Sequence, residues 1–517
     1  MRESGMLFPV FSLPSKFGIG CFSREAYEFV DFLEKSGQGF WQILPVGPTG
    51  FGNSPYQPFS AFAGNPYFIS PETLIEEGLL TWDECNGRDW GGNAESVDYG
   101  ALYENRFEVL RLAFNRFRER DDEKKEYEAF LKKEEFWLED YALYMAIKEA
   151  QGGKSWIDWE DEDLRKRKES ALKEAEKELA DEIALIRFEQ YEFDKQWRKL
   201  KKYANEKQVK IIGDLPFYVS LDSADAWSHP EVFQMDKDLV PEVVAGCPPD
   251  AFSATGQLWG NPIYDWEGQK KDHYGWWVQR IGRNYEFYDV IRIDHFHGFC
   301  DYYAIPYGDE TAEHGTLEKG PGMDLFTELE KQLGKLSIIA EDLGNNTPEN
   351  EKLLKDSGFP GMKVLQYGFT SWDSYYVNHR HIQNCVVYTG THDNTPTRAW
   401  FDEINDGERD FARRYINSMN SDPGQFVWDF IREAYRSVAD LCIIPLQDYL
   451  CKGKEARINT PGTDEGNWQW RLAPNFLSED LARSIRALTE LYSRIPKVEH
   501  DEETEAQISR KGWSYGK

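Results

Sequence analysis

The sequence lacks a long hydrophobic run and is poor in basic residues. No stretch of about 18 consecutive apolar residues occurs among its 517 residues, so we expect no transmembrane helix. The first 20 residues lack the long apolar segment of a secretory signal peptide. The 60 Lys and Arg residues against 91 Asp and Glu residues give a net charge of −31. Nucleic acids and anionic membranes are bound through basic patches, so we expect neither as a partner.

Cysteine is scarce and irregularly spaced, and the common nucleotide-binding motifs are missing. The seven cysteines include no Cys-x-x-Cys pair, which argues against a disulfide framework and against a zinc site. No Gly-x-Gly-x-x-Gly motif stands at a strand–helix turn, and no complete phosphate loop ending in Gly-Lys-Ser/Thr is present. The sequence is therefore expected to be that of a soluble, cytoplasmic protein that binds neither a dinucleotide nor a nucleoside triphosphate.

Aromatic residues, by contrast, make up 15% of the chain. Most of them are expected to pack inside the protein, but flat rings are also the surfaces on which neutral sugars or planar ligands pack. A neutral substrate agrees with the strongly negative charge of the chain.

Short apolar runs recur along the chain, and each ends in polar or Gly/Pro-rich sequence. They are FWQILPV (40–46), VKIIGDLPFYV (209–219), VIRIDHF (290–296), LSIIAEDL (336–343), MKVLQY (362–367), NCVVYTGTHD (384–393) and LCIIPLQDYL (441–450). Runs this apolar are typical of strands buried on both faces of a parallel sheet. Helix-like segments lie between them, as after Thr347-Pro348 and around 422–439. The alternation predicts an α/β fold, either a (β/α)8 barrel or an open doubly wound sheet.

The position of the polar residues favours the (β/α)8 TIM barrel. Carboxylates cluster just after the apolar runs, where the strand ends and βα loops of a barrel build the active site. We assign residues 1–71 and 206–517 to the barrel. Residues 72–205 have a different composition, with apolar residues at helical spacing among many charges, and are predicted to form a mainly helical insertion packed on the barrel. Its charge runs are interpreted as solvated helix faces.

Arg292 and Asp294 end one of the predicted strands. They are two residues apart, so their side chains point to the same side of the strand. An Arg beside an Asp keeps the carboxylate ionised, as a nucleophile requires. The alternative is a structural Arg–Asp pair at the barrel rim.

Two further strands end in acidic residues. Glu341 and Asp342 follow one strand. Glu341 is a candidate proton donor if its pKa is raised. The alternative role for either residue is that of a helix N-cap. His392 and Asp393 follow another strand. The structural alternative for Asp393 is a helix cap. Three carboxylates on three strand ends suit glycosidic bond cleavage, with one nucleophile, one acid and one group that binds sugar hydroxyls. A divalent-metal site is the alternative, although no His-x-x-x-His motif or dense Asp/Asn/Gly loop occurs.

Eight sequence blocks carry a resemblance to a known family. They are SGMLFPVFSLPSKFGIG (4–20), WQILPVGPTGFGNSPYQPFSAFAGNPYFIS (41–70), IIGDLPFYVSLDSADAW (211–227), GCPPDAFSATGQLWGNPIYDW (246–266), VIRIDHFHGF (290–299), IIAEDLG (338–344), YTGTHDN (388–394) and INTPGTDEGNW (458–468). With them the chain closely resembles the 4-α-glucanotransferases of glycoside hydrolase family 77 in the α-amylase clan, also called amylomaltases or disproportionating enzymes. The resemblance covers essentially the whole chain.

The resemblance implies a role for each matching residue. Asp294 corresponds to the nucleophile, Glu341 to the general acid/base and Asp393 to the transition-state stabiliser. It further implies a loop at 246–262 that folds over the glucan. The substrate-binding residues that it implies are Tyr56, Asp214, Asp250, Gln257, Trp259, Arg292, His392 and Asn467. Among them, Asp214 is interpreted as mainly structural and not catalytic.

The implied reaction moves a segment of a maltodextrin donor to the 4-hydroxyl of glucose or another glucan, without a cofactor or a metal. An α-glucan hydrolase of the same clan is the first alternative, and a catalytically inactive glucan-binding protein is the second. The chain departs from the family pattern at His297, where Arg is more frequent, at Cys247, where Val is usual, and at Ala251, where an aromatic is common. Two of these lie in the 246–262 segment, so we expect chain-length or acceptor preference to differ.

Overall fold

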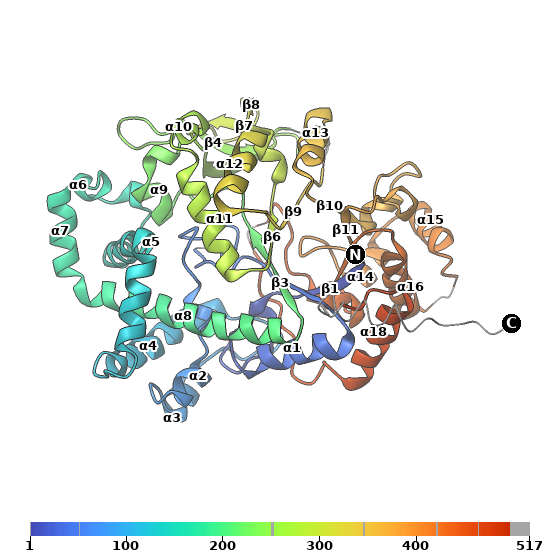
Figure 1. Cartoon of the computed structure of the whole chain (residues 1–517), viewed down its shortest axis with the longest axis horizontal. Coiled ribbons are helices and arrows are strands. Elements are labelled where there is room, and N and C mark those ends of the chain that lie inside the picture. The colour runs from blue at the N-terminus through green and yellow to red at the C-terminus, as the bar shows by residue number, and fades with distance from the viewer. Residues whose placement is uncertain are drawn as a thin grey trace, which may run out of the picture.

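The computed structural model describes residues 2–50, 52–249, 253–344, 347–419, 422–463 and 465–496. Eight parallel strands close into a barrel in the order β1-β12-β11-β10-β9-β6-β3-β2 (Figure 1). They are β1 (Glu3–Leu7), β2 (Phe40–Gln42), β3 (Lys210–Leu215), β6 (Val290–Ile293), β9 (Ile338–Ala340), β10 (Gly361–Val364), β11 (Cys385–Tyr388) and β12 (Leu441–Pro445). The predicted (β/α)8 barrel is confirmed, and the open sheet is wrong.

Six of the eight barrel strands lie within the apolar runs of the sequence, and β10 begins one residue before its run, at Gly361. The strand without such a run is β1, whose first three residues are Glu3, Ser4 and Gly5. This strand joins β12 to β2 and so closes the barrel. Its glycine is required by the packing, because a Cβ atom at Gly5 would lie 2.5 Å from Cβ of Phe40 on β2.

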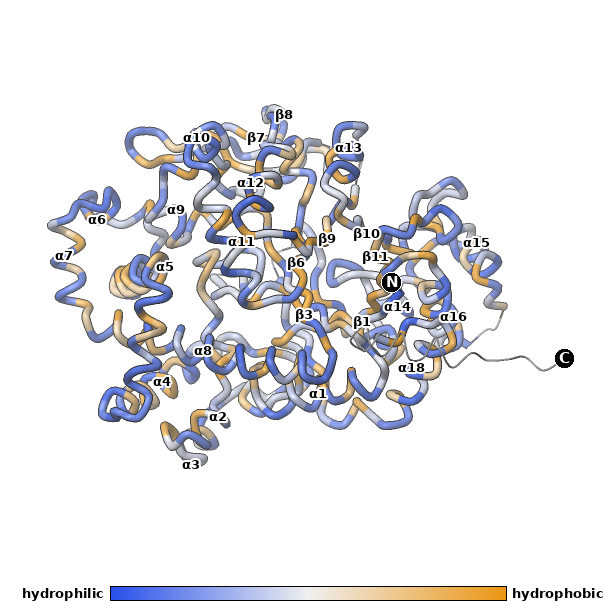
Figure 2. The backbone as a smooth tube through the Cα atoms, viewed as in Figure 1, coloured by the Kyte–Doolittle hydropathy of each residue, from blue (hydrophilic) through white to orange (hydrophobic). Residues whose placement is uncertain are grey.

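Helices surround the barrel on the outside. Outside the segment between β2 and β3 they are α1 (Arg24–Ser36), α9 (Ala224–Ser228), α10 (Trp266–Lys271), α11 (Gly275–Phe287), α12 (Met323–Leu333), α13 (Pro348–Ser357), α14 (Thr397–Glu403), α15 (Asp406–Ile416), α16 (Pro423–Arg436), α17 (Leu446–Tyr449) and α18 (Glu479–Leu491). The helices expected after Thr347-Pro348 and near residues 422–439 are therefore present as α13 and α16. In Figure 2 the hydrophobic colour runs along β3 and β6 at the centre of the molecule.

The chain between β2 and β3 folds into helices that lie beside the barrel, at the left of Figure 1. They are α2 (Pro71–Glu76), α3 (Trp82–Asn86), α4 (Tyr99–Phe117), α5 (Lys124–Ala150), α6 (Glu162–Arg165), α7 (Glu169–Glu178) and α8 (Ala180–Glu206). The rings of Phe193 and Trp197 on α8 each lie 5.2 Å from that of Phe22, so α8 shares the apolar core that includes the barrel. The tripeptide Gly153-Lys154-Ser155 follows helix α5, not a strand, unlike a phosphate loop.

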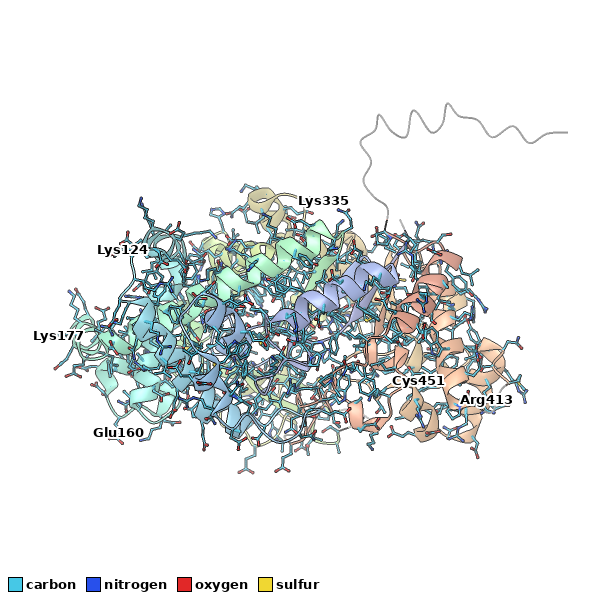
Figure 3. All side chains as sticks on the ribbon, turned by 90° about the horizontal axis from the view of Figure 1, so that it is seen from below. Lys124, Glu160, Lys177, Lys335, Arg413 and Cys451 are labelled. Carbon is cyan, nitrogen blue, oxygen red and sulfur yellow. The ribbon has the colours of Figure 1, made fainter. Side chains whose placement is uncertain are left out.

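Charged side chains cover the outside of these helices. Lys124, Glu160 and Lys177 are exposed and project outward in Figure 3. Within the described residues, no helix has the length and apolarity needed to cross a membrane.

A second, antiparallel sheet lies between β3 and β9 along the chain. Its order is β5-β4-β7-β8, formed by β4 (Val243–Cys247), β5 (Gln257–Pro262), β7 (Asp301–Pro306) and β8 (Thr316–Lys319). Within the segment 246–262, predicted to be a loop, residues 246–247 and 257–262 therefore belong to the paired strands β4 and β5. These residues form strands and not a loop because β4 pairs with both β5 and β7. Each neighbour satisfies the main-chain hydrogen-bonding groups along one edge of β4.

Candidate active site

Asp294 and Glu341 stand side by side at the carboxyl ends of two neighbouring barrel strands. In the register of β6 with β9, Ile293 is opposite Ala340, the residue before Glu341. The pairing continues one residue further, because the Glu341 amide donates to the Ile293 carbonyl at 3.0 Å. Two acidic residues thus follow paired positions and meet at the same rim.

Arg292 holds two carboxylates from inside the barrel. Its Nη1 atom donates to both oxygens of Asp214 at 2.7 Å, and its Nη2 atom donates to Oδ1 of Asp294 at 2.9 Å. Asp214 and Arg292 are opposite each other in the register of β3 with β6. The side chain of Asp214 is fully buried, whereas that of Asp294 is 31% exposed. The arginine therefore orients the accessible carboxylate from below, and Asp214 balances part of the charge of the arginine.

A hydrogen-bonded chain links this group to the third carboxylate. The Tyr56 hydroxyl donates to Oδ2 of Asp214 at 2.8 Å and lies 2.9 Å from Nε2 of His392. Because the single hydroxyl proton of Tyr56 is directed to Asp214, Nε2 of His392 must carry the proton of the second contact. The same Nε2 atom lies 3.3 Å from Oδ2 of Asp393. Trp468 packs against the rings of Tyr56 and His392, at 5.8 and 6.1 Å between centroids.

Asp393 is held in the loop after β11. Asn459 donates from Nδ2 to its Oδ1 atom at 2.6 Å. The two ends of the loop are joined by the buried Asp448, which accepts hydrogen bonds from the hydroxyls of Thr389 and Thr397 at 2.6 and 2.7 Å. The side chain of Asp393 remains 36% exposed, so one carboxylate face is open to a ligand.

The N-cap alternatives for the acidic residues are wrong. Helix α13 is capped by Thr347, and helix α14 has Pro396 at the cap position without a side-chain hydrogen bond. Asp342 is buried instead and accepts from the main-chain amide of Met362 at 2.6 Å, which ties the end of β9 to β10. Neither Asp342 nor Asp393 lies at a helix start. In the part of the chain that the structure describes, no group of three or more His, Cys, Asp or Glu side chains is arranged to hold a metal ion.

Glu341 has the electrostatic environment of a proton donor. Burial, and then the negative charge of Asp294, raise the pKa of Glu341 to about 8. Main-chain amides of His295 and Leu343 donate to its two oxygens at 2.8 and 2.9 Å and fix the orientation of the carboxyl group. A carboxyl group that is protonated at neutral pH and stands next to an ionised carboxylate is the combination used in glycosidic bond cleavage.

Comparison with known proteins agrees with this geometry. The family model described as 4-alpha-glucanotransferase matches residues 8–477. The chain belongs to this family. It is 46% identical over 486 residues to the 4-alpha-glucanotransferase of Clostridium butyricum, covering 93% of this chain and 99% of that protein. It is 43% identical to that of Thermus thermophilus, covering 96% and 99%. The solved amylomaltase of Streptococcus agalactiae in complex with acarbose superposes with a TM-score of 0.93 at 41% identity, over 96% of this chain and all of that one.

In this member of the 4-alpha-glucanotransferase family, strand β5 lies beside the carboxylates. Trp259 on β5 packs edge-to-face on His295, with 5.2 Å between ring centroids, and its indole N–H donates to the exposed Gln257 at 3.1 Å. Since His295 follows Asp294, this places both predicted residues of β5 near the nucleophile candidate. The predicted residue Asp250, and Ala251 beside it, lie outside the described residues.

Asn467 is engaged within its own loop. Its Oδ1 atom accepts from the main-chain amide of Thr460 at 2.9 Å, and its Nδ2 atom donates to the carbonyl and hydroxyl of Thr463 at 2.8 and 3.1 Å. The side chain thus closes a turn next to Trp468. Its contact with substrate stays a prediction.

Four residues near the carboxylates were not singled out from the sequence: Asn459, Trp468, His295 and Tyr367. Asn459 and Trp468 both belong to the block 458–468. This block indicated the site, although nothing in the sequence selects these two residues within it. His295 adopts a left-handed backbone conformation (φ 50°), which turns the chain sharply after the strand. Burial lowers the pKa of His295 to about 4, so its ring is neutral beside the nucleophile candidate.

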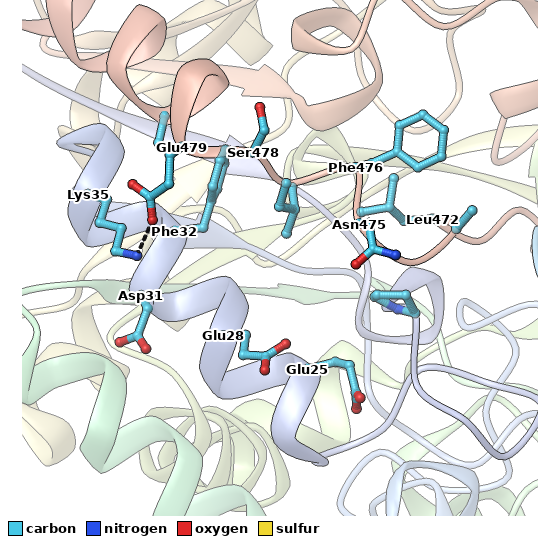
Figure 4. A pocket seen from close by; sticks show the side chains of 14 residues that line it. Glu25, Glu28, Asp31, Phe32, Lys35, Leu472, Asn475, Phe476, Ser478 and Glu479 are labelled. Atoms are coloured by element: carbon cyan, nitrogen blue, oxygen red, sulfur yellow. Dashed lines mark hydrogen bonds and ion pairs between the residues drawn. The ribbon is translucent and has the colours of Figure 1, made fainter.

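A separate cavity of about 270 Å3 lies between α1 and the segment before α18 (Figure 4). It is lined by acidic residues of α1 and closed at one side by the ion pair of Lys35 with Glu479, at 2.6 Å. None of the three strand-end carboxylates lines it. The carboxylate site at the barrel rim is therefore separate from this cavity.

Proposed function

We propose that the chain is a retaining 4-α-glucanotransferase that moves a segment of a 1,4-α-glucan to the 4-hydroxyl of glucose or of another 1,4-α-glucan. The observation that carries the proposal is the juxtaposition of Asp294, bound to Arg292, with Glu341, whose carboxyl pKa is raised to about 8. Family membership supports the same reaction.

In the first step, a carboxylate oxygen of Asp294 attacks the anomeric carbon of the donor sugar. The bond from this carbon to the bridging oxygen breaks, and the oxygen takes the proton of Glu341. The products are a glycosyl ester on Asp294 and a shortened glucan with a free 4-hydroxyl.

In the second step, the ionised Glu341 removes the proton of the acceptor 4-hydroxyl as its oxygen attacks the anomeric carbon. The ester bond breaks and Asp294 returns to the carboxylate form, so two inversions retain the configuration. Ester formation has removed the charge of Asp294, which is one of the causes of the raised pKa of Glu341. The pKa of Glu341 is therefore lower in the intermediate, which keeps it ionised as a base.

Asp393 is proposed to bind hydroxyl groups of the sugar whose anomeric carbon reacts. It is held by Asn459 and His392, and it is accessible on one side. Positive charge develops on the sugar ring in the transition state, and a fixed carboxylate stabilises it more strongly than it stabilises the ground state.

Transfer requires that a sugar hydroxyl reach the ester before water does. The Trp259–His295 contact and the neighbouring Tyr218 form an aromatic wall next to Asp294, where ring contacts lie at 5.2 and 6.3 Å. Such a wall favours a sugar acceptor over water, because it offers a glucan apolar contact that water cannot use. Substrates are neutral maltodextrins, which suits the acidic chain, and its seven cysteines, which form no disulfide in the described residues, fit a cytoplasmic location.

Incubation with maltotriose alone tests the proposal. Transfer gives glucose together with a ladder of longer maltodextrins, while the total number of reducing ends stays constant. A steady rise of reducing ends without longer products would replace the transferase by a hydrolase. The Asp294→Asn variant is the control, because it keeps the shape of the site and lacks the nucleophile.

A further inference from the structure

The connection between β10 and β11 carries Tyr367, Trp372, Tyr375 and Tyr376 on a turn that begins beside the carboxylate site. The rings of Tyr367 and Tyr376 pack edge-to-face, with 5.4 Å between centroids. Trp372 and Tyr375, which lie between them in the sequence, are 77% and 67% exposed. We call these four residues the aromatic strip. Two of its rings pack on each other, and the other two have most of their surface in water.

The inner half of the strip is part of the rim of the site. The side-chain amide of Asn394, next to Asp393, donates to the Tyr367 hydroxyl at 3.1 Å. Burial raises the pKa of Tyr376 to about 12, and the charge of Glu341 is among the further causes. Tyr367 therefore contacts the residue next to Asp393, and Tyr376 packs on the ring of Tyr367.

The outer half of the strip sits on a turn with fixed ends. The Ser374 hydroxyl donates to the Tyr367 carbonyl at 3.1 Å and folds the turn back on itself. His381 contacts the Tyr376 carbonyl through Nε2 at 3.0 Å and the Ser437 hydroxyl through Nδ1 at 2.8 Å, which anchors the turn to the body of the protein. The two exposed rings are thus held out on an anchored turn.

The chemistry of the strip selects a neutral ligand with flat apolar faces. Its exposed members are aromatic, and the nearby charges are of both signs, with Asp373 between the two rings and Arg380 5.8 Å from the Tyr375 ring centroid, while the whole chain carries a net charge of −31, which disfavours an anionic partner. Pyranose rings have apolar faces that pack on Trp and Tyr while their hydroxyls stay hydrated. Because the Ser374 hydroxyl bonds the Tyr367 carbonyl, the turn that carries Trp372 and Tyr375 folds back beside the rim residue Tyr367, where a glucan leaving the carboxylates on this side would pass.

We propose that Trp372 and Tyr375 form an outer glucan-binding subsite that engages sugar units of long 1,4-α-glucans beyond those held at the carboxylates. The inference rests on the proposed function, because it extends the same substrate. It makes the strip a determinant of chain-length preference.

The test compares long and short glucans in the double variant Trp372→Ala/Tyr375→Ala. Loss of two stacking contacts is expected to raise KM for amylose about 3- to 10-fold, and to raise KM for maltotriose by a clearly smaller factor. Ile382→Ala is the matched control, since it removes an aliphatic side chain that is 62% exposed on the same connection. Thermal unfolding of each variant checks that the fold is kept.

Single substitutions at Trp372 separate stacking from general apolarity. Trp372→Phe keeps a flat ring and is expected to retain most of the amylose affinity, whereas Trp372→Leu keeps apolar volume without a flat face and is expected to lose it. Equal behaviour of the two variants would overturn the subsite, as would equal KM ratios for amylose and maltotriose in the double variant and the parent.

A binding measurement distinguishes failure of this inference from failure of the proposed function. Calorimetric titration of maltoheptaose into the Asp294→Asn protein, with and without the double substitution, is expected to show a Kd about 3- to 10-fold higher in its presence. An unchanged Kd refutes the outer subsite even if transfer is observed. If the parent enzyme forms no ladder from maltotriose, the proposed function fails, and the calorimetric result still decides whether the strip binds a glucan.

Discussion

Both carboxylate oxygens of Asp214 lie 2.7 Å from Nη1 of Arg292. The second terminal nitrogen of the same guanidinium reaches Asp294, so one buried arginine is shared by the buried Asp214 and the proposed nucleophile. The planar fork of arginine suits this arrangement, because its nitrogens point in fixed and different directions. Asp214 keeps Arg292 from acting as an uncompensated buried charge, and Arg292 in turn fixes Asp294.

Replacing Arg292 by Lys tests the shared guanidinium. A single ammonium group cannot hydrogen-bond both carboxylates in the same geometry, so we expect kcat for maltotriose disproportionation to fall about 100-fold or more. Glucose release under saturating maltotriose measures it. Arg436→Lys, at a side chain that is 53% exposed, is the control and should leave the rate unchanged. A kcat within threefold of the parent for Arg292→Lys would remove the orienting role.

The pH dependence of the rate reports the proton of Glu341. The proposed donor must be protonated in the free enzyme, and its pKa is raised to about 8. The proton is present below this pH and is lost above it, so kcat/KM is expected to fall as pH rises through about 8, approaching tenfold per pH unit. Initial rates between pH 5 and 10 measure the profile.

Substitution at the same site sharpens the pH test. Glu341→Gln cannot donate a proton to the leaving oxygen and is expected to lower kcat by about 100- to 10,000-fold. In Asp294→Asn the charge that helps to raise the pKa of Glu341 is gone, so titration of this carboxyl by infrared difference spectroscopy should move to lower pH. A parent profile that stays flat to pH 10 would contradict the assignment of Glu341 as the acid.

The sequence predicts the barrel and the acidic residues of its rim because both depend on local pattern. Apolar runs reveal strands that are buried on both faces, and a carboxylate just after such a run must lie at the strand end. Strand β1 is not predicted in this way, because Glu3, Ser4 and Gly5 are not apolar. The glycine at position 5 is required by its close approach to Phe40 of a neighbouring strand.

The partners of the carboxylates depend on contacts that local pattern does not contain. Asn459 is 66 residues from Asp393 in the chain, and Tyr56 is 158 residues from Asp214. Tyr56 was found only through family resemblance, and Asn459 was not found. The N-cap alternative for Asp342 is wrong for a related reason, because a carboxylate after a strand can equally bind the next strand of the barrel, as it does at the amide of Met362.

Asn459 is expected to act as a positioning residue for Asp393. Asn459→Ala removes the 2.6 Å hydrogen bond and should lower kcat about tenfold with a smaller effect on KM, because the proposed role of Asp393 is strongest in the transition state. Asn459→Asp places a like charge beside Asp393 and should be worse than Ala. Asn105→Ala on α4 is the control. The opposite order, with Asp better than Ala, would show that Asp393 is protonated or is not held by this contact.

Glu189 provides a prediction about stability that is independent of catalysis. This residue of α8 is 4% exposed, and among the described residues its Oε1 atom has no hydrogen-bond partner. Burial raises the pKa of Glu189 from its ordinary 4.5 to about 8. A carboxyl whose pKa is higher in the folded than in the unfolded state favours folding below the unfolded value, and this contribution is lost as pH rises through the folded value.

The Glu189→Gln variant removes this titration. The parent protein loses stability between about pH 4.5 and 8, by an amount on the order of a few kcal/mol, whereas a neutral amide of the same shape does not. Thermal unfolding should therefore show Glu189→Gln a few degrees more stable than the parent at pH 8, with the difference shrinking toward pH 5. Glu176→Gln, at an exposed position of α7, is the control and should show no such trend. A difference that is the same at both pH values would mean that Glu189 does not change its protonation on unfolding, and that the buried carboxyl has a partner which compensates its charge.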